Sequence, residues 1–162
     1  GMGPQRLARE NGVSMAEAKK FIEDYFAKYP GIKGFTDECV ETAKKQGYVS
    51  TILGRKRLLP EIQSTNIGLK ITAEHMAVNT PIQGSAADLI KVAMVRLHAK
   101  LKARKMETAM LLQVHDELVF EAPKGEVDEA RKIIIDEMEN AMKLKVPLKV
   151  DVGVGKSWLE AH

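Results

Sequence analysis

The spacing of hydrophobic residues changes along this chain of 162 residues, and each change predicts a new structural element. Apolar residues recur at helical intervals over residues 15–28, directly after the capping-box pair Ser14 and Glu17. A weaker helical pattern covers residues 32–46, and Gly47 is typical of the residue that follows a helix. The first third of the chain is therefore predicted to form two helices.

A small basic hairpin is predicted next. Residues 48–52 favour a strand, Leu53-Gly54 can reverse the chain, and residues 55–59 run back before Pro60.

Helical spacing returns over residues 64–78. Pro81 has no N–H to donate and crowds the preceding turn, so we expect it to interrupt this helix. A long helix then resumes over residues 85–105, with apolar residues on one side and lysines and arginines on the other.

The spacing of apolar residues changes again in the last third of the chain. Two short apolar runs, residues 110–114 and 118–121, predict a β-hairpin with a charged tip, and residues 127–141 predict an amphipathic helix. Residues 148–154 alternate apolar and polar side chains, which predicts a strand with one buried face. The C-terminal half is thus predicted to be ββαβ, with a small antiparallel sheet. The chain as a whole is predicted to be one compact α+β unit without a linker.

Composition favours a folded protein, because 44% of the residues are hydrophobic and 29% are charged. The apolar runs are far shorter than a membrane span requires, so no transmembrane helix is expected. The N-terminus has no apolar stretch typical of a signal peptide. The single cysteine, Cys39, cannot form an internal disulfide, and this fits a cytoplasmic protein.

Charge is divided unevenly along the chain. Residues 1–105 carry 18 Lys or Arg against 10 Asp or Glu, whereas residues 106–162 carry 7 against 12. A basic segment can bind a polyanion by releasing counterions, and an acidic one repels it unless cations intervene. The alternative is an ordinary solvated surface of mixed charge.

The predicted tip of the second hairpin carries adjacent carboxylates, Asp116 and Glu117, beside His115. Such hard oxygen ligands suit Mg²⁺, which binds one or two protein carboxylates together with waters and phosphates. The apolar flanking strands predict a buried, rigid platform beneath the tip. An ordinary polar hairpin turn is the alternative.

Two other segments could contact nucleic acid. Asn79 and Gln83 flank the predicted helix break, where amide side chains can donate to phosphates, sugars or minor-groove acceptors. The alternative there is a simple helix corner with Ser85 as the cap of the next helix. The cluster Arg55-Lys56-Arg57 can contact phosphates, although such short basic clusters are more often only solvated.

These segments together resemble DNA polymerases of family A, and the likeness extends over the whole chain. The motifs occur in the family's order and are Gly1-Met2-Gly3, Gly54-Arg55-Lys56-Arg57 with Pro60, Asn79-Thr80-Pro81-Ile82-Gln83-Gly84-Ser85-Ala86-Ala87-Asp88, Gln113-Val114-His115-Asp116-Glu117-Leu118-Val119-Phe120-Glu121, and Trp158 with Ala161-His162. The fourth resembles the last polymerase signature, motif C. The resemblance implies the C-terminal part of the fingers in residues 1–63 and a portion of the palm in residues 64–162.

The resemblance also implies the activity, which is template-directed transfer of nucleotides to a primer 3′-hydroxyl. Asp116 would be one of two aspartates that hold paired Mg²⁺ ions, and Glu117 would support it. Primer-template DNA and deoxynucleoside triphosphates would be the partners. The DNA contacts would come from residues in both halves of the chain, namely Arg55, Lys56, Arg57, His75, Asn79, Gln83, Gln113 and His115.

Two departures from the family pattern matter. His75 stands where most members have Arg, so a phosphate contact there would be weaker and pH-dependent. The other metal-binding aspartate and the nucleotide-binding helix would precede Gly1, as in a fragment or a short reading frame. The isolated chain is therefore predicted to be inactive. It would form a homodimer through an exposed palm edge or face. The alternative function is a non-catalytic DNA-binding or assembly module.

Overall fold

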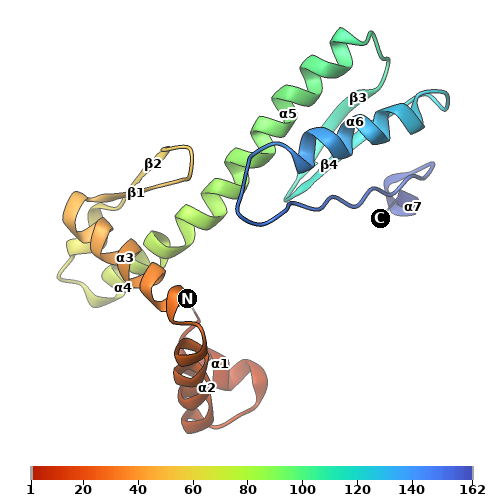
Figure 1. The fold of residues 1–162 in the computed structure, drawn as a ribbon. Helices are drawn as coiled ribbons and strands as arrows, with labels where there is room; N and C mark the ends of the chain where they lie inside the picture. The colour runs from red at the N-terminus through yellow and green to blue at the C-terminus, as the bar shows by residue number, and fades with distance from the viewer. Residues whose placement is uncertain (1, 162) are drawn as a thin grey trace. The chain divides into compact units, whose positions relative to one another are not determined.

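The computed structural model describes residues 2–161, and packing divides the chain into two compact units, residues 1–85 and residues 86–162 (Figure 1). The expectation of one compact unit is therefore wrong. The reason is that the buried side chains form two separate hydrophobic clusters, one in each unit. The assignment of residues 1–63 to fingers and 64–162 to palm stays a prediction.

The first unit is mostly helical. Its elements are α1 (Pro4–Asn11), α2 (Met15–Lys28), α3 (Pro30–Gln46), β1 (Tyr48–Ser50), β2 (Lys56–Leu58), the 3-10 helix η1 (Pro60–Gln63), α4 (Ile67–Asn79) and the π-helix η2 (Thr80–Gly84). The two predicted helices and the predicted basic hairpin are confirmed. Helix α1 was not predicted by the hydrophobic spacing.

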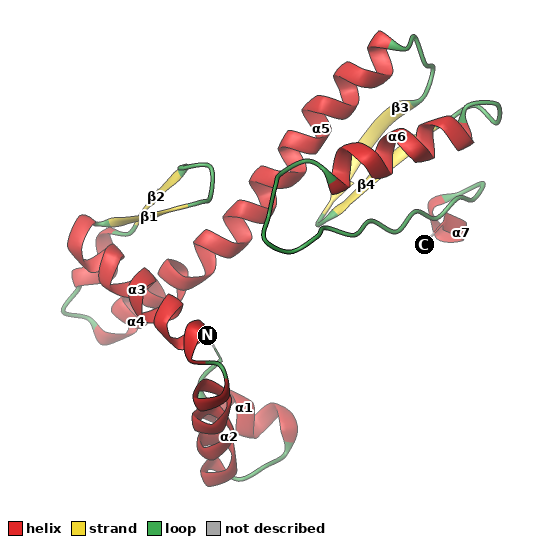
Figure 2. Ribbon diagram, in the orientation of Figure 1, coloured by secondary structure: helices red, strands yellow, loops and turns green. Residues whose placement is uncertain are grey.

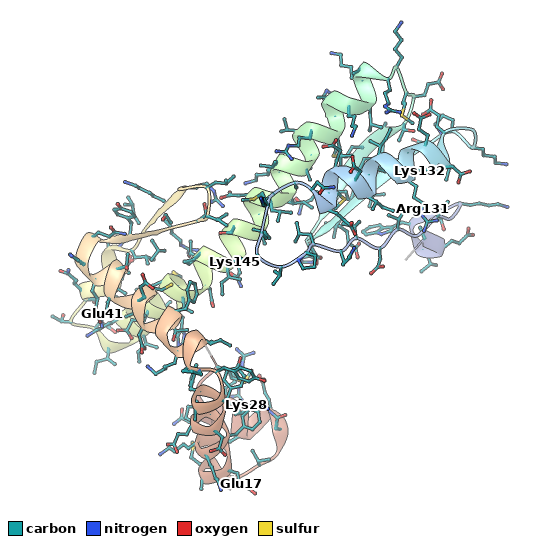
Figure 3. The ribbon with its side chains drawn as sticks, in the orientation of Figure 1. Glu17, Lys28, Glu41, Arg131, Lys132 and Lys145 are labelled. Carbon is teal, nitrogen blue, oxygen red and sulfur yellow. The ribbon has the colours of Figure 1, made fainter. Side chains whose placement is uncertain are left out.

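Local signals define the ends of these helices. Ser14 Oγ accepts a hydrogen bond from the backbone N–H of Glu17, whose carboxylate in turn accepts one from the N–H of Ser14. Glu17 and Lys28 mark the two ends of α2 in Figure 3. Gly47 follows α3 with φ at 77°, a left-handed conformation that glycine adopts without strain.

The core of the first unit joins the hairpin to two helices. Val49 of β1 and Leu59 after β2 are buried against residues of α3, η1 and α4. The cluster consists of Ala43, Val49, Leu59, Ile62, Ala73 and Ala77. Small alanines on α3 and α4 allow these helices to pack closely.

The predicted interruption at Pro81 is present, because α4 ends at Asn79, but the chain stays helical beyond it. Residues 80–84 form a π-helix, and Ser85 begins the next helix at once with helical φ and ψ. A π-turn absorbs one extra residue, so the chain continues through the proline with a widened turn. Ser85 is accordingly not an N-cap. Its Oγ donates instead to the carbonyl of Pro81.

The second unit places a long helix and a shorter one beside a two-stranded sheet (Figure 2). Its elements are α5 (Ser85–Ala103), which starts at the last residue of the first unit, β3 (Ala109–Val114), β4 (Glu117–Glu121), α6 (Val127–Glu139) and α7 (Trp158–Ala161). The long helix, the hairpin and the amphipathic helix are confirmed. No helix among residues 2–161 is both long and apolar enough to cross a bilayer.

Helices α5 and α6 share the core of this unit with the hairpin. The buried members are Leu97, Leu101, Ala130, Ile133 and Ile134, and the partly buried Met106, Met110, Leu118, Phe120 and Met138 pack against them. Polar contacts join α5 to residues in and after α6 at the border of this core. Arg96 Nη1 donates to the carbonyl of Asn140 at 2.9 Å. Lys100 Nζ donates to the carboxylates of Glu137 and Asp136, and these hydrogen bonds raise the pKa of Lys100.

The predicted strand over residues 148–154 is not present. Alternation of apolar and polar residues selects a buried face, but a strand also needs a backbone partner. Within the described residues, β3 and β4 pair only with each other. Residues 153–155 lie instead against α7, so closely that a side chain at Gly153 or Gly155 would overlap atoms of Glu160 and Ala161. The observed C-terminal half is ββα with a terminal helical turn.

Candidate functional site

The tip of the β3–β4 hairpin is a two-residue turn that presents a carboxylate to solvent. Val114 pairs with Glu117, so His115 and Asp116 form the turn between them, and both are exposed. His115 has φ at 52°, a left-handed conformation that is uncommon for a residue with a side chain. The side-chain amide of Gln113 donates to the carbonyl of His115 and thereby holds this turn. Such backbone outliers cluster at functional sites.

A β-bulge at Leu111 determines what lies beneath the tip. Met110 pairs with Phe120 but Leu112 pairs with Val119, so one extra residue stands in β3. Cross-strand partners share a face, and the bulge therefore moves Leu112 to the face opposite the core.

The expected buried platform is thus only half present. The inner face of the hairpin packs on α5 and α6 through Met110, Leu118 and Phe120. Leu111 and Leu112 on β3 are 55% and 43% exposed. The apolar sequence of both strands predicted a buried platform, whereas this unit packs against only one face of the hairpin.

The donor set at the tip fits a hard divalent cation. Asp116 and Glu117 offer carboxylate oxygens, the ligand type that Mg²⁺ prefers, and Mg²⁺ usually takes its other ligands from water or phosphate. Among residues 2–161 there is no cluster of three or more His, Cys, Asp or Glu side chains that could complete a site. Any metal here would therefore need phosphate oxygens, waters or carboxylates from beyond these residues.

The predicted DNA-contacting amides lie in the first unit. His75 and Asn79 are four residues apart on α4 and are therefore neighbours along one side of that helix. Gln83 lies within the π-turn η2, and all three side chains are exposed. The contact of these residues with DNA stays a prediction.

Two residues of the basic cluster, Lys56 and Arg57, lie on β2 and contact other residues of the first unit. Lys56 Nζ lies 4.3 Å from the centre of the Tyr48 ring, a cation–π contact across the hairpin. Arg57 donates to Thr80 Oγ1 at 3.4 Å and approaches Met76 Sδ at 3.3 Å. These side chains remain exposed, so the contacts leave part of each available to solvent.

Arg55 lies at a junction between the hairpin and η2 that the sequence did not predict. Its Nη2 donates to the carbonyl of Gly84 at 3.1 Å, and the N–H of Ile52 donates to Ser85 Oγ at 2.8 Å. Thr51 completes the turn by accepting the backbone N–H of Arg55 on its Oγ1 at 3.2 Å. Ile52 and Ser85 are 33 positions apart, and no short-range pattern signals a contact over that distance.

Comparison with known proteins identifies the chain. The profile of DNA polymerase family A matches residues 1–160. The chain is 48% identical over 161 residues to DNA polymerase I of Bacillus caldotenax and 45% identical to the thermostable DNA polymerase I of Thermus filiformis. Each match covers 99% of this chain but only 18% and 19% of those polymerases.

A comparison with solved structures gives the same result as the sequence matches. The chain is similar to the POL domain of Pol1 from M. smegmatis, solved in complex with DNA primer-template and dNTP. The TM-score is 0.96 at 45% sequence identity, over 99% of this chain and 28% of that one. The motifs, the fold and these matches all point to one conclusion, that this chain belongs to DNA polymerase family A.

Proposed function

We propose that this chain forms part of a DNA-directed DNA polymerase that adds nucleotides to a primer 3′-hydroxyl on a DNA template. The observation that carries the proposal is the tight turn at His115 and Asp116, which holds a carboxylate in solvent at the position of motif C. The similar Pol1 domain was solved with primer-template DNA and dNTP, which supports DNA and nucleotides as partners.

Asp116 is the residue we assign to metal binding, with Glu117 in support. Bound Mg²⁺ would supply activation of the primer hydroxyl and charge stabilisation at the leaving pyrophosphate. The turn contributes by fixing the backbone from which the Asp116 side chain projects, because that backbone is paired at Val114 and Glu117. A preorganised backbone limits how far the carboxylate must reorganise as negative charge develops.

DNA would be held by residues of both units. We assign minor-groove contacts to the amides of Asn79 and Gln83, because acceptors in that groove are nearly the same for all base pairs. This would let the protein bind any sequence. His115 and Gln113 would lie near the primer terminus. His75 and the basic residues Lys56 and Arg57 would add attraction to phosphate.

The 162 residues alone would bind DNA without extending a primer. By this assignment they contain one of the two metal-binding aspartates, and one exposed aspartate at a turn binds Mg²⁺ weakly. We further propose that the chain alone forms a two-fold dimer through the edge or the outer face of the β3–β4 hairpin. We place the complete enzyme in the cytoplasm, with roles in replication and repair.

Primer extension tests the proposal. The experiment would compare the 162-residue chain with the complete polymerase that carries it, using a fluorescent primer annealed to a DNA template, dNTPs and Mg²⁺. We expect extension by the complete protein and only salt-sensitive DNA binding by the chain. DNA binding without extension by the complete protein would favour the non-catalytic module and overturn the polymerase assignment.

A further inference from the structure

The basic hairpin is attached to the π-turn η2 at both ends of that turn. Arg57 Nη1 donates to Thr80, the first residue of η2, and Arg55 Nη2 donates to the carbonyl of Gly84, the last. The two arginines therefore span the turn from one side. Arginine suits this task because its planar guanidinium offers several donors in a fixed arrangement.

The turn of the hairpin also packs directly on the end of η2. Ser85 Oγ accepts the N–H of Ile52 at 2.8 Å and donates to the carbonyl of Pro81, so one hydroxyl joins the hairpin to the π-turn. A Cβ added at Gly84 would lie 2.6 Å from Thr51 Cγ2. Glycine suits this position because the Thr51 side chain approaches so closely.

These outside contacts add to the hydrogen bonds of the π-turn itself. A π-turn is a rare conformation, and Pro81 removes one hydrogen-bond donor from it. Asn79 immediately precedes the turn and Gln83 lies within it, so the shape of the turn sets the direction of Gln83 relative to Asn79. Whatever holds η2 in its widened form also holds this pair of amides.

We propose that Arg55 is a positioning residue that, together with Ser85, locks η2 so that Asn79 and Gln83 face the DNA as a fixed pair. The inference rests on the proposed function of those two amides. In this role the Arg55 guanidinium acts through Gly84 and need not touch a phosphate itself.

Hydrogen exchange of the 162-residue chain tests the lock without DNA. Arg55→Met removes the guanidinium, and Lys45→Met is the matched control because Lys45 is an exposed cation on the last turn of α3. We expect the amides of Ile52 and Ser85 to exchange about tenfold faster in Arg55→Met only, as expected when a charged hydrogen bond is lost locally. Unchanged exchange would overturn the positioning role.

DNA affinity of the same variants, measured by fluorescence anisotropy with a labelled primer-template, separates positioning from phosphate contact. Loss of a phosphate contact lowers the slope of log affinity against log salt by about 1. We expect Arg55→Met to weaken binding with an unchanged slope and to add little to the effect of Gln83→Ala, since both act on one contact. A lowered slope with unchanged exchange would assign Arg55 to phosphate and overturn the proposal.

A steric variant gives a second route if Arg55→Met does not fold. Gly84→Ala should open the junction and accelerate exchange at Ile52, because the new methyl meets Thr51 Cγ2. Thr51→Ser removes that methyl and keeps the hydroxyl that accepts the Arg55 N–H, so the double variant should recover slow exchange. Failure of this rescue would overturn the packing described. A wild-type chain that binds no DNA would instead overturn the proposed function.

Discussion

The Glu126 carboxylate accepts a hydrogen bond from the hydroxyl of Thr108 at 2.6 Å and a second, at 2.8 Å, from the backbone N–H of the same residue. It also accepts the N–H of Glu107 at 3.0 Å. One carboxylate just before α6 thus accepts hydrogen bonds from two backbone N–H groups of the segment that leads into β3. These bonds, the Thr108 hydroxyl first, hold the pKa of Glu126 below its ordinary value.

We expect this contact to make the stability of the second unit pH-dependent. The pKa of Glu126 is lowered on folding, so its contribution is fully present above the ordinary glutamate pKa and is lost as pH falls through the lowered value. Amide exchange at Glu107 and Thr108 should therefore accelerate in acid. Glu126→Gln should exchange faster than wild type at neutral pH, and the two should converge once the pH falls below the lowered pKa of Glu126. A constant difference across this range would contradict the assignment.

Replacement of Asp116, the proposed metal ligand, should lower turnover far more than DNA affinity. In the complete polymerase, Asp116→Asn keeps the shape of the side chain and removes the charge that would neutralise metal ions. We expect turnover to fall by several orders of magnitude while DNA affinity stays nearly unchanged, because an interaction made mainly in the transition state affects rate more than ground-state binding. Single-turnover extension and anisotropy measure the two quantities. Equal turnover of variant and wild type would rule out the metal role.

Leu97 should be among the most sensitive positions for folding. Leu97 lies on α5, and its side chain is fully buried in the cluster that α5 shares with α6. Leu97→Ala leaves a cavity there and should lower the free energy of unfolding by about 2–5 kcal/mol. Val95→Ala on the same helix is the control, since Val95 is 71% exposed and its truncation should change stability by less than about 0.5 kcal/mol. Urea unfolding followed by circular dichroism compares them. Similar values would mean that α5 does not pack as described.

The outer face of the β3–β4 hairpin should mediate self-association of the isolated chain. Leu111 and Leu112 expose apolar surface beside strand edges that are unpaired within residues 2–161. Size exclusion with light scattering at micromolar concentration should give about twice the chain mass of 18.0 kDa. Leu112→Glu should restore the monomer, whereas Leu58→Glu on β2 of the first unit should not. A wild-type monomer would remove the dimer from the proposal.

Interactions within a few residues could be predicted from the sequence by itself. The capping box of Ser14 and Glu17 and the left-handed Gly47 depend only on neighbours along the chain, and both are present. The two hairpins were also predicted, the first because Leu53-Gly54 can reverse the chain after a β-prone segment, and the second because His115-Asp116-Glu117 separates two apolar runs. The observed turn of the second is one residue shorter, since Glu117 pairs with Val114. The candidate metal ligand Asp116 followed from the same local pattern.

Only tertiary structure decided the features that depend on distant partners. The alternating pattern of residues 148–154 could select a face but could not supply a neighbouring strand, so no strand forms in the described chain. In the sequence, Pro81 could either end the helical path or widen it into a π-turn. The π-turn η2 that forms is in contact with a hairpin about 30 residues earlier in the chain. The sequence predicted Arg55 as a phosphate contact, with a solvated cation as the alternative, because its acceptor, the Gly84 carbonyl, is brought to it only by folding. Local hydrogen bonds are encoded by adjacent residues, whereas these contacts require the whole unit to be packed.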